Sequence, residues 1–416
     1  MSKRKQIKEE KDKVNKISDV KMAYIMYGKK VFIIPIVITI ILGAVIWGIV
    51  YNARKNNAPQ ESADNQKEQI NYIWGEIKPG KRNTNNFTTV TSSDGVEVPV
   101  PTGYTASSAS DENSVNGGFV IYEGTDTVTD SNKWEAQCNR NQYVWIPIAE
   151  VSDMYWRDQT TGKKYGTQYI FYESSYTKDS TLKQEPQTTQ YDIQSTYLTQ
   201  YLNGMSRGDF LMEMEIDFDK MLNSVATYGG FYIGRYETGD LSQATPVVKR
   251  MNTDNLDINS QTWYTMWKKA RKLSGTSAGV QMIWGIQWDE TLKWLIDTGE
   301  KTYSEVGSDS TSWGNYQNNS FTYYKDTSKT TATKVSSKSK RIPSGASEGA
   351  NSNNVYDLAG NVNEWTLEAV DVGTGNSRCY RGGNYSAYGG NTPAGVRVYS
   401  FPYAGYLGLR CTLFIK

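Results

Sequence analysis

The 416-residue chain contains no histidine and only three cysteines. Histidine is the commonest general base near neutral pH and the commonest protein ligand for transition metals. Its absence excludes a Ser-His-Asp triad, a His-based zinc site and a His-ligated iron centre.

The chain also lacks an excess of charge of either sign. Lys and Arg together number 45, Asp and Glu number 44, and the formal net charge is +1. A nearly neutral chain has no global field that would attract nucleic acid or an acidic polymer. We therefore expect no nucleic-acid partner.

Charge is absent from one long apolar run, residues 31–51 (VFIIPIVITIILGAVIWGIVY). About 20 apolar residues in a helix are enough to span the core of a bilayer. The apolar part of a cleaved signal peptide is shorter, and a helix buried in a protein core is seldom so uniformly apolar. Both alternatives therefore fit this run less well than a transmembrane helix does. Lys29 and Lys30 end a basic segment before this run, and basic flanks stay preferentially in the cytoplasm. The pattern predicts a cell-membrane protein with a cytoplasmic tail (1–30), a single transmembrane helix (31–51) and an exported remainder.

The exported part divides by composition. Residues 52–85 are polar and poor in large apolar side chains, which predicts a stalk. Residues 86–416 form the predicted folded domain. Within it, residues 152–208 are rich in Tyr, Gln and Thr without sustained periodicity, which indicates a surface insertion.

Short β-branched and aromatic runs bounded by Gly, Pro and Asn predict strands within 96–104, 117–124, 142–151 and 229–239. Apolar residues at helical spacing predict helices over 210–225, 262–273 and 288–296. The segment 299–350 is expected to be loop-like. These elements together predict an α+β, loop-rich domain.

Six motifs follow one another in a specific order: GGFYIGRYETG, GIQWDETLKWL, IPSGASE, YDLAGNVNEWT, YRGGNY and GLR. In this order they resemble the formylglycine-generating-enzyme-like, or sulfatase-modifying-factor-like, family. The resemblance covers roughly residues 96–416 and implies an elaborated C-type-lectin-type fold.

The oxidases of that family use a cysteine pair that holds copper between the RGG and terminal motifs, and related sulfoxide-forming enzymes use a histidine cluster. Residues 384–410 contain no cysteine, and Cys379 and Cys411 lie outside that segment. We therefore expect no enzymatic activity of this kind, since thiolate chemistry needs a sulfur at the site. An enzyme with a different site stays an alternative, which a cluster of perturbed carboxyl or Lys pKa values in a cleft would indicate.

The three cysteines have two interpretations. Outside the cell, Cys379 and Cys411 can form a disulfide that joins the two ends of the intervening segment, and Cys138 then stays a free thiol. Alternatively, all three are small buried apolar side chains.

The resemblance also implies one cofactor, a structural calcium ion. The family's Asn and Glu ligands of the GNxWEW motif match Asn361 and Glu364, although Asn363 stands where the family usually has Trp. Oxygen ligands of this kind suit calcium. The alternative is that both side chains only form hydrogen bonds within a turn.

The segment 384–407 (NYSAYGGNTPAGVRVYSFPYAGYL) interleaves aromatic residues with Ser, Gly and Ala. Antibody combining sites use the same mixture, because Tyr offers a large contact area with few rotatable bonds. Pro393, Arg397 and Pro402 are predicted to be framework. The predicted ligand-binding residues are Ser386, Ala387, Tyr388, Val396, Val398, Tyr399, Ser400, Phe401, Tyr403, Gly405 and Tyr406.

The same segment lacks Lys, Glu, Gln, Met and Trp, which codons ending in a pyrimidine cannot encode. In this it resembles C-type-lectin-fold proteins whose matching segment is varied by a diversity-generating retroelement. Together with the predicted transmembrane helix 31–51, the resemblance implies an adhesin- or receptor-like protein at the cell surface that binds an exogenous protein or glycan. The alternatives are that the Tyr and Gly residues simply complete the fold, as in a structural envelope or phage-derived protein, or the enzyme considered above.

Overall fold

The computed structural model describes residues 75–184, 195–253, 262–320, 322–329, 332–334, 340–369, 378–402 and 407–416. All of them belong to one compact unit, residues 69–416. The predicted transmembrane segment 31–51 and most of the predicted stalk lie outside the described residues. Among the residues that are described, no helix is both long enough and apolar enough to cross a bilayer.

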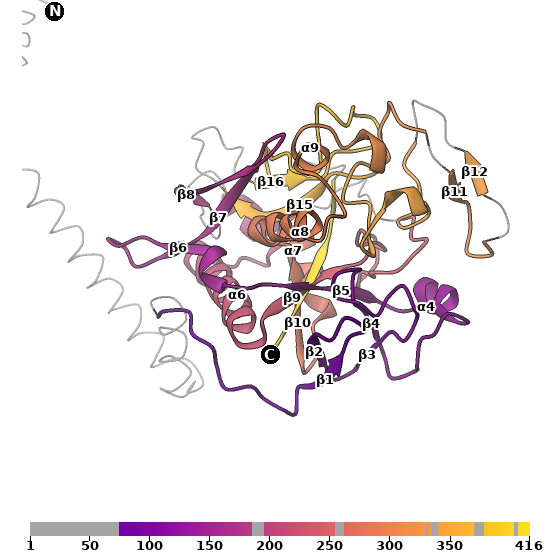
Figure 1. Cartoon of the computed structure of the whole chain (residues 1–416). Helices are drawn as coiled ribbons and strands as arrows, with labels where there is room; N and C mark the ends of the chain where they lie inside the picture. The colour runs from indigo at the N-terminus through magenta and orange to yellow at the C-terminus, as the bar shows by residue number, and fades with distance from the viewer. Residues whose placement is uncertain are drawn as a thin grey trace, which may run out of the picture. The chain divides into compact units, whose positions relative to one another are not determined.

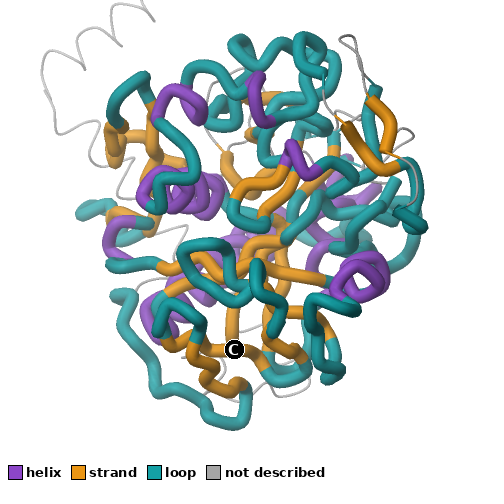
Figure 2. The backbone as a smooth tube through the Cα atoms, turned by 45° about the vertical axis from the view of Figure 1, so that its right-hand side comes forward, coloured by secondary structure: helices purple, strands orange, loops and turns teal. Residues whose placement is uncertain are grey.

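The described part of the chain is a mixed α+β structure, as predicted. Its largest sheet is antiparallel and runs in the order β10 (Ala278–Met282), β19 (Cys411–Ile415), β9 (Gly230–Gly234), β5 (Gln142–Pro147), β4 (Val120–Glu123) and β3 (Tyr104–Ala106). The strands lie in the middle of the molecule, with helices and long loops around them (Figure 2). The C-terminal strand β19 is thus paired on both edges inside this sheet.

A second sheet carries the C-terminal motifs. Its order is β17 (Val398–Ser400), β16 (Arg378–Arg381), β15 (Glu364–Ala369) and β18 (Gly408–Leu409), with β15 and β18 parallel. The remaining strands form a three-stranded sheet and three pairs: β6 (Tyr155–Arg157), β7 (Lys164–Phe171) and β8 (Tyr176–Gln184); β1 (Phe87–Thr91) and β2 (Glu97–Pro101); β11 (Thr322–Tyr324) and β12 (Ala332–Lys334); and β13 (Asn351–Ser352) and β14 (Val355–Tyr356).

Three of the helices pack on the sheets: α6 (Arg207–Tyr228) on β9 and β19, α7 (Trp263–Ala270) on β10, and α8 (Gly285–Asp297) on β5, β7 and β15. The other helical segments are α4 (Lys133–Asn139), α5 (Ser195–Tyr201), α9 (Tyr303–Gly307), and the short 3-10 turns η1 (Val151–Asp153), η2 (Arg271–Leu273), η3 (Thr311–Trp313) and η4 (Glu348–Ala350). Figure 1 shows β16 in the upper part of the view, below α9, and β1 to β3 in the lower part.

Helix α6 forms where the sequence predicts a helix, and its ends have local causes. Ser206 caps the N-terminus by accepting a hydrogen bond from the Asp209 backbone N–H at 3.1 Å. Gly229 ends the helix at a φ of +84°, a conformation that glycine adopts without strain. The predicted apolar face, including Met214, Phe218 and Leu222, is buried.

The other predicted elements are confirmed with shifted ends. The predicted helix 262–273 is α7 followed by η2, and the predicted helix 288–296 begins earlier, at Gly285. The segment 299–350 is not wholly loop-like, because it contains α9 and the β11–β12 pair. The segment expected to be a surface insertion forms β6, β7, β8 and α5, and β7 is mostly buried since α8 packs on it.

Candidate functional site

The segment 384–402 leaves β16 through two glycines that the local geometry requires. At Gly383 φ is +74°, and a Cβ there would lie 2.4 Å from the Thr392 carbonyl oxygen. The Tyr316 hydroxyl donates to the carbonyl oxygens of Gly382 (2.8 Å) and Thr392 (2.9 Å). This hydroxyl therefore ties the first turn of the segment to its middle.

Residues outside the segment bind its backbone at several further points. The Trp288 indole donates to the Ala394 carbonyl oxygen at 2.9 Å, and the Ala394 N–H donates to the Ser310 hydroxyl at 2.9 Å. The Gly395 N–H donates to the Val306 carbonyl oxygen at 2.9 Å. The backbone path is thus held by α8, by the end of α9 and by the residues that follow it.

A buried network of charged side chains lies beneath the second half of the segment. Arg381 donates to the Val396 carbonyl oxygen (2.7 Å) and to Asp289 (2.8 Å). Arg397 forms ion pairs with Asp289 and with Glu368. Because every one of these side chains is largely buried, the pairs are shielded from salt and hold the backbone more firmly than surface pairs would.

This network also contacts β7. The Arg397 guanidinium donates to the Tyr169 carbonyl oxygen at 2.7 Å, and the Tyr169 N–H donates to Asp289 at 2.8 Å. Strand alternation then turns Ile170 outward, with 36 % of its surface exposed, and Tyr172 just beyond the strand is 48 % exposed. Sequence analysis missed these neighbours of the segment, because residues 169–172 (YIFY) show no alternation of apolar and polar side chains that would mark an exposed face.

The predicted ligand-binding residues separate into classes. Tyr388 and Phe401 are large exposed side chains, at 50 % and 37 % exposed, and Ser386 is exposed as well. Ala387, Val396, Val398, Tyr399 and Ser400 are half-buried. Tyr403, Gly405 and Tyr406 lie outside the described residues.

Tyr399 differs from the other aromatic residues of the segment because its hydroxyl donates to Glu368 at 2.6 Å. Burial raises the pKa of this phenol, and the neighbouring Glu368 carboxylate raises it further. Tyr399 therefore acts at least in part as a support of β17. The predicted framework residues Pro393 and Pro402 are buried, and the Arg397 side chain is 8 % exposed.

The contacts of Asn361 and Glu364 do not fit a calcium site. Both Glu364 oxygens accept hydrogen bonds from the Arg410 guanidinium, at 2.6 and 2.9 Å. The Asn361 amide oxygen accepts from Asn315 (2.9 Å) and from the Ile342 N–H (3.0 Å), while its amide nitrogen donates to Glu237. A cation at this place would lie against Arg410, so calcium stays a prediction that these contacts do not support.

Glu364 belongs to a cluster of buried carboxyls with Glu237 and Asp357. Burial raises the pKa of Glu364 to about 7 and that of Asp357 to about 6, while Arg410 opposes both shifts. Burial also raises the pKa of Glu237, and the charges of the two neighbouring carboxyls add to it. All three side chains are at most 1 % exposed, so this cluster is a structural core rather than a cleft.

The cysteines are three separate thiols in the structure, with Cys379 and Cys411 buried and Cys138 half-buried. Burial raises the pKa of the Cys379 and Cys411 thiols, which makes them poor nucleophiles. The second interpretation, small buried side chains, therefore describes Cys379 and Cys411.

No family model matches the chain, and no curated protein matches it. Several chains of solved structures show a partial likeness, among them the following two. One is described as the crystal structure of CarF, with 16% sequence identity, a TM-score of 0.28, and coverage of 45% of this chain and 87% of that one. The other is the Treponema denticola variable protein 1, with 16% identity, a TM-score of 0.28, and coverage of 44% and 84%.

Proposed function

We propose that the chain is a ligand-binding protein that presents the segment 384–407 to an exogenous protein or glycan. The observation that carries the proposal is that the segment combines a firmly held backbone with exposed side chains. Its described backbone is fixed by Tyr316, Trp288, Arg381 and Arg397, while Ser386, Tyr388 and Phe401 are exposed.

This contrast suits binding for a physical reason. A surface that is already ordered loses little conformational entropy when it binds, so more of its contact energy appears as affinity. Exposed Tyr and Phe supply large rigid contacts with few rotors to freeze. Because the supports are buried and come mostly from outside the segment, exposed residues can change identity without moving the backbone.

The proposal includes membrane anchoring through residues 31–51 and display outside the cytoplasm. The expected result is that the full chain stays in the membrane fraction after alkaline carbonate washing. In intact spheroplasts, added protease should cleave the C-terminal domain. Recovery of the chain in the wash, or full protection from the protease, would contradict the anchor or its orientation.

The binding proposal is tested by selecting ligands for the full chain from a displayed random-peptide library and from a glycan array. Selected ligands are then measured against a triple variant, Ser386→Ala, Tyr388→Ala and Phe401→Ala. We expect binding to weaken by tenfold or more, on the order of 1.4 kcal/mol or greater, since exposed aromatic anchors dominate such surfaces. The matched control is Val96→Ala, an exposed apolar residue in the loop between β1 and β2. Equal affinity of the triple variant and the wild type would exclude this segment as the binding surface.

Diversification of the segment is tested in the neighbouring DNA. It should contain a near-copy of the sequence that encodes the C-terminal segment, differing mainly where the copy has adenine, together with a reverse transcriptase. Their absence would leave a binding protein with a fixed surface.

The enzyme alternative depends on perturbed carboxyls gathered in a cleft. The cluster of Glu237, Asp357 and Glu364 has raised pKa values, but all three side chains are at most 1 % exposed, so they are not open to a substrate. The geometry therefore favours the binding proposal.

A further inference from the structure

The largest sheet has two edge strands, β10 on one side and β3 on the other. An edge strand presents a row of main-chain N–H and C=O groups that no neighbouring strand binds. At β10 the chain closes this row itself. The Ser274 hydroxyl accepts from the Val280 N–H at 2.8 Å and donates to the Val280 carbonyl oxygen at 3.1 Å. The Gly275 N–H donates to the Ala278 carbonyl oxygen at 2.9 Å, so the turn before β10 caps that edge.

At the opposite edge, the hydrogen bonds on either side of β3 determine which of its groups point outward. The Gly124 N–H donates to the Gly103 carbonyl oxygen at 2.7 Å, and the Ser107 N–H donates to the Val120 carbonyl oxygen at 2.9 Å. Hydrogen-bonded pairs alternate along an antiparallel ladder, so Thr105 directs both of its main-chain groups toward β4. The two residues beside Thr105 therefore direct theirs away from β4.

These two residues are Tyr104 and Ala106, and both are half-buried. Within the part of the chain that the structure describes, their outward N–H and C=O groups form no hydrogen bond with another segment. Both residues line a hollow of about 510 Å³. The edge of β3 thus offers two donors and two acceptors to a partner that enters this hollow.

Strand β3 also lacks the features that usually protect an edge. Charged side chains, proline and bulges are the common ones. The preceding strand β2 carries Pro99 and Pro101, two residues without a main-chain N–H. In contrast, β3 has the sequence Tyr-Thr-Ala and pairs with β4 in an unbroken register. Nothing in its own sequence therefore prevents another strand from pairing with it.

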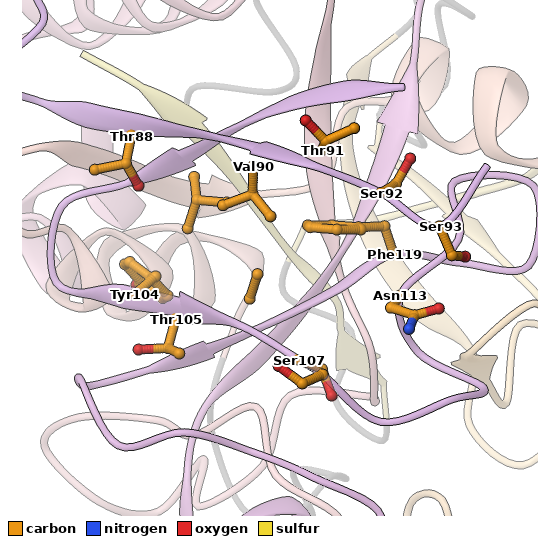
Figure 3. Close-up of a pocket in the computed structure, with 13 residues that line it drawn as sticks. Thr88, Val90, Thr91, Ser92, Ser93, Tyr104, Thr105, Ser107, Asn113 and Phe119 are labelled. Carbon is orange, nitrogen blue, oxygen red and sulfur yellow. The ribbon is translucent and has the colours of Figure 1, made fainter. Parts of the chain in front are cut away.

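The hollow beside β3 is uncharged and has an apolar floor. Figure 3 shows Thr88 and Val90 of β1 on one side of it and Tyr104 on the other, with Phe119 between them. Phe119 and Val100 are each 1 % exposed. No Lys, Arg, Asp or Glu is among the residues that line it. A charged side chain that entered would lose water without gaining a partner, so the hollow favours an uncharged guest.

The rim of the hollow carries polar side chains. Thr91, Ser93 and Ser108 are exposed, and Asn113 is half-buried. Their hydroxyl and amide groups can both donate and accept hydrogen bonds. Side chains of an extended chain point alternately to opposite sides. A strand in the hollow would therefore place one set of side chains on the apolar floor and the other set at the polar rim.

We propose that the edge of β3 binds an extended, uncharged segment of a partner protein, which adds a strand to the six-stranded sheet beside Tyr104 and Ala106. In this mode of recognition, main-chain hydrogen bonds supply affinity and pockets for alternate side chains supply specificity. The segment would alternate small apolar residues, against Val100 and Phe119, with Ser, Thr or Asn. The hollow contains no residue of segment 384–407, and this inference does not depend on the proposed function.

The test begins with peptides selected on the full chain from a displayed library of random octapeptides. Their synthetic forms are measured by fluorescence anisotropy against the wild type and the variant Ala106→Pro. Proline is tolerated on the open side of an edge strand, where its missing N–H leaves no ladder bond unmade. We expect a loss of about tenfold or more in affinity, because a hydrogen bond is removed and the ring obstructs the added strand. The matched control is Ala106→Ser, which keeps the N–H and should bind as the wild type does.

A second measurement leaves the protein unchanged and varies the peptide. Each peptide residue in turn is N-methylated, which removes one main-chain N–H. Because only one edge of an added strand faces β3, methylation should weaken binding at alternate positions and have little effect at the positions between them. Hydrogen exchange adds a local readout, since the amides of residues 104 and 106 should exchange more slowly in the complex.

Three results would overturn the proposal: no selected peptide that loses affinity in Ala106→Pro, no alternation in the N-methylated series, or an equal loss in Ala106→Ser. Peptides that lose affinity only in the triple variant of Ser386, Tyr388 and Phe401 belong to the other surface, so the two proposals fail separately. Self-association that Ala106→Pro abolishes, without peptide binding, would replace the partner with a second copy of the chain. Binding of maltotriose without peptide binding would make the hollow a sugar site and contradict strand addition.

Discussion

At the scale of single residues, Arg410 does more than the GLR motif suggests. It donates to both Glu364 oxygens and to the carbonyl oxygens of Gly234 and Tyr356, so one side chain joins both main sheets and β14. It is also the positive charge that compensates a cluster of buried carboxyls. In this chain, the arginine of the GLR motif therefore stabilises the fold by joining separate strands.

We predict that Arg410→Met lowers the free energy of unfolding by about 3–5 kcal/mol, because it leaves the Glu364 carboxylate buried without its partner. Urea denaturation measures the loss. The double variant Arg410→Met, Glu364→Gln should recover part of it, since the unpaired charge is removed. A double variant no more stable than the single one would show that the ion pair is not the cause.

At the scale of elements, the first turn of segment 384–402 shows how a backbone conformation and a close contact act together. We predict that Gly383→Ala lowers the free energy of unfolding by about 1–3 kcal/mol beyond the cost in a matched control. The control is Gly95→Ala, where φ is +81° but no atom lies within 4 Å of the new Cβ. The difference between the two variants in urea denaturation isolates the contact with Thr392. Equal losses would mean that positive φ alone accounts for the effect.

The hydrogen bond between Tyr399 of β17 and Glu368 of β15 gives a second prediction at this scale. Tyr399→Phe removes the hydroxyl that donates to Glu368 and should cost about 1 kcal/mol of stability. Tyr388→Phe, at the 50 % exposed position, should change stability by less than about 0.5 kcal/mol. Thermal denaturation of the two variants compares a supporting tyrosine with an exposed one. A larger loss from Tyr388→Phe would reverse these assignments.

At the scale of the whole molecule, buried carboxyls make stability depend on pH. Burial raises the pKa of Glu290 and of Asp219 to about 7, from ordinary values of 4.5 and 3.8. At a pH between the ordinary and the raised pKa values, the folded state therefore binds more protons than the unfolded state. The free energy of unfolding then falls as the pH rises through this range. We predict a decrease in the free energy of unfolding between about pH 4.5 and pH 7.

The variant Glu290→Gln tests this dependence at one site. Its amide stays neutral at every pH and still accepts from the Tyr169 hydroxyl, so the decrease should shrink by on the order of 2 kcal/mol. Urea denaturation at a series of pH values measures both proteins. The control is Glu173→Gln, an exposed carboxyl in the turn between β7 and β8. An unchanged slope in Glu290→Gln would contradict the assignment.

The sequence by itself determined the α+β class and the positions of α6, α7, α8 and β9, because their apolar periodicity and end residues act locally. It also indicated the segment 384–407 from composition. Only the tertiary structure decided which of its residues are exposed, since Tyr388 and Tyr399 look alike in the chain but only Tyr399 meets Glu368. The same holds for Glu364, because its pairing with Arg410 joins two separate motifs of the chain and no local pattern encodes such a contact.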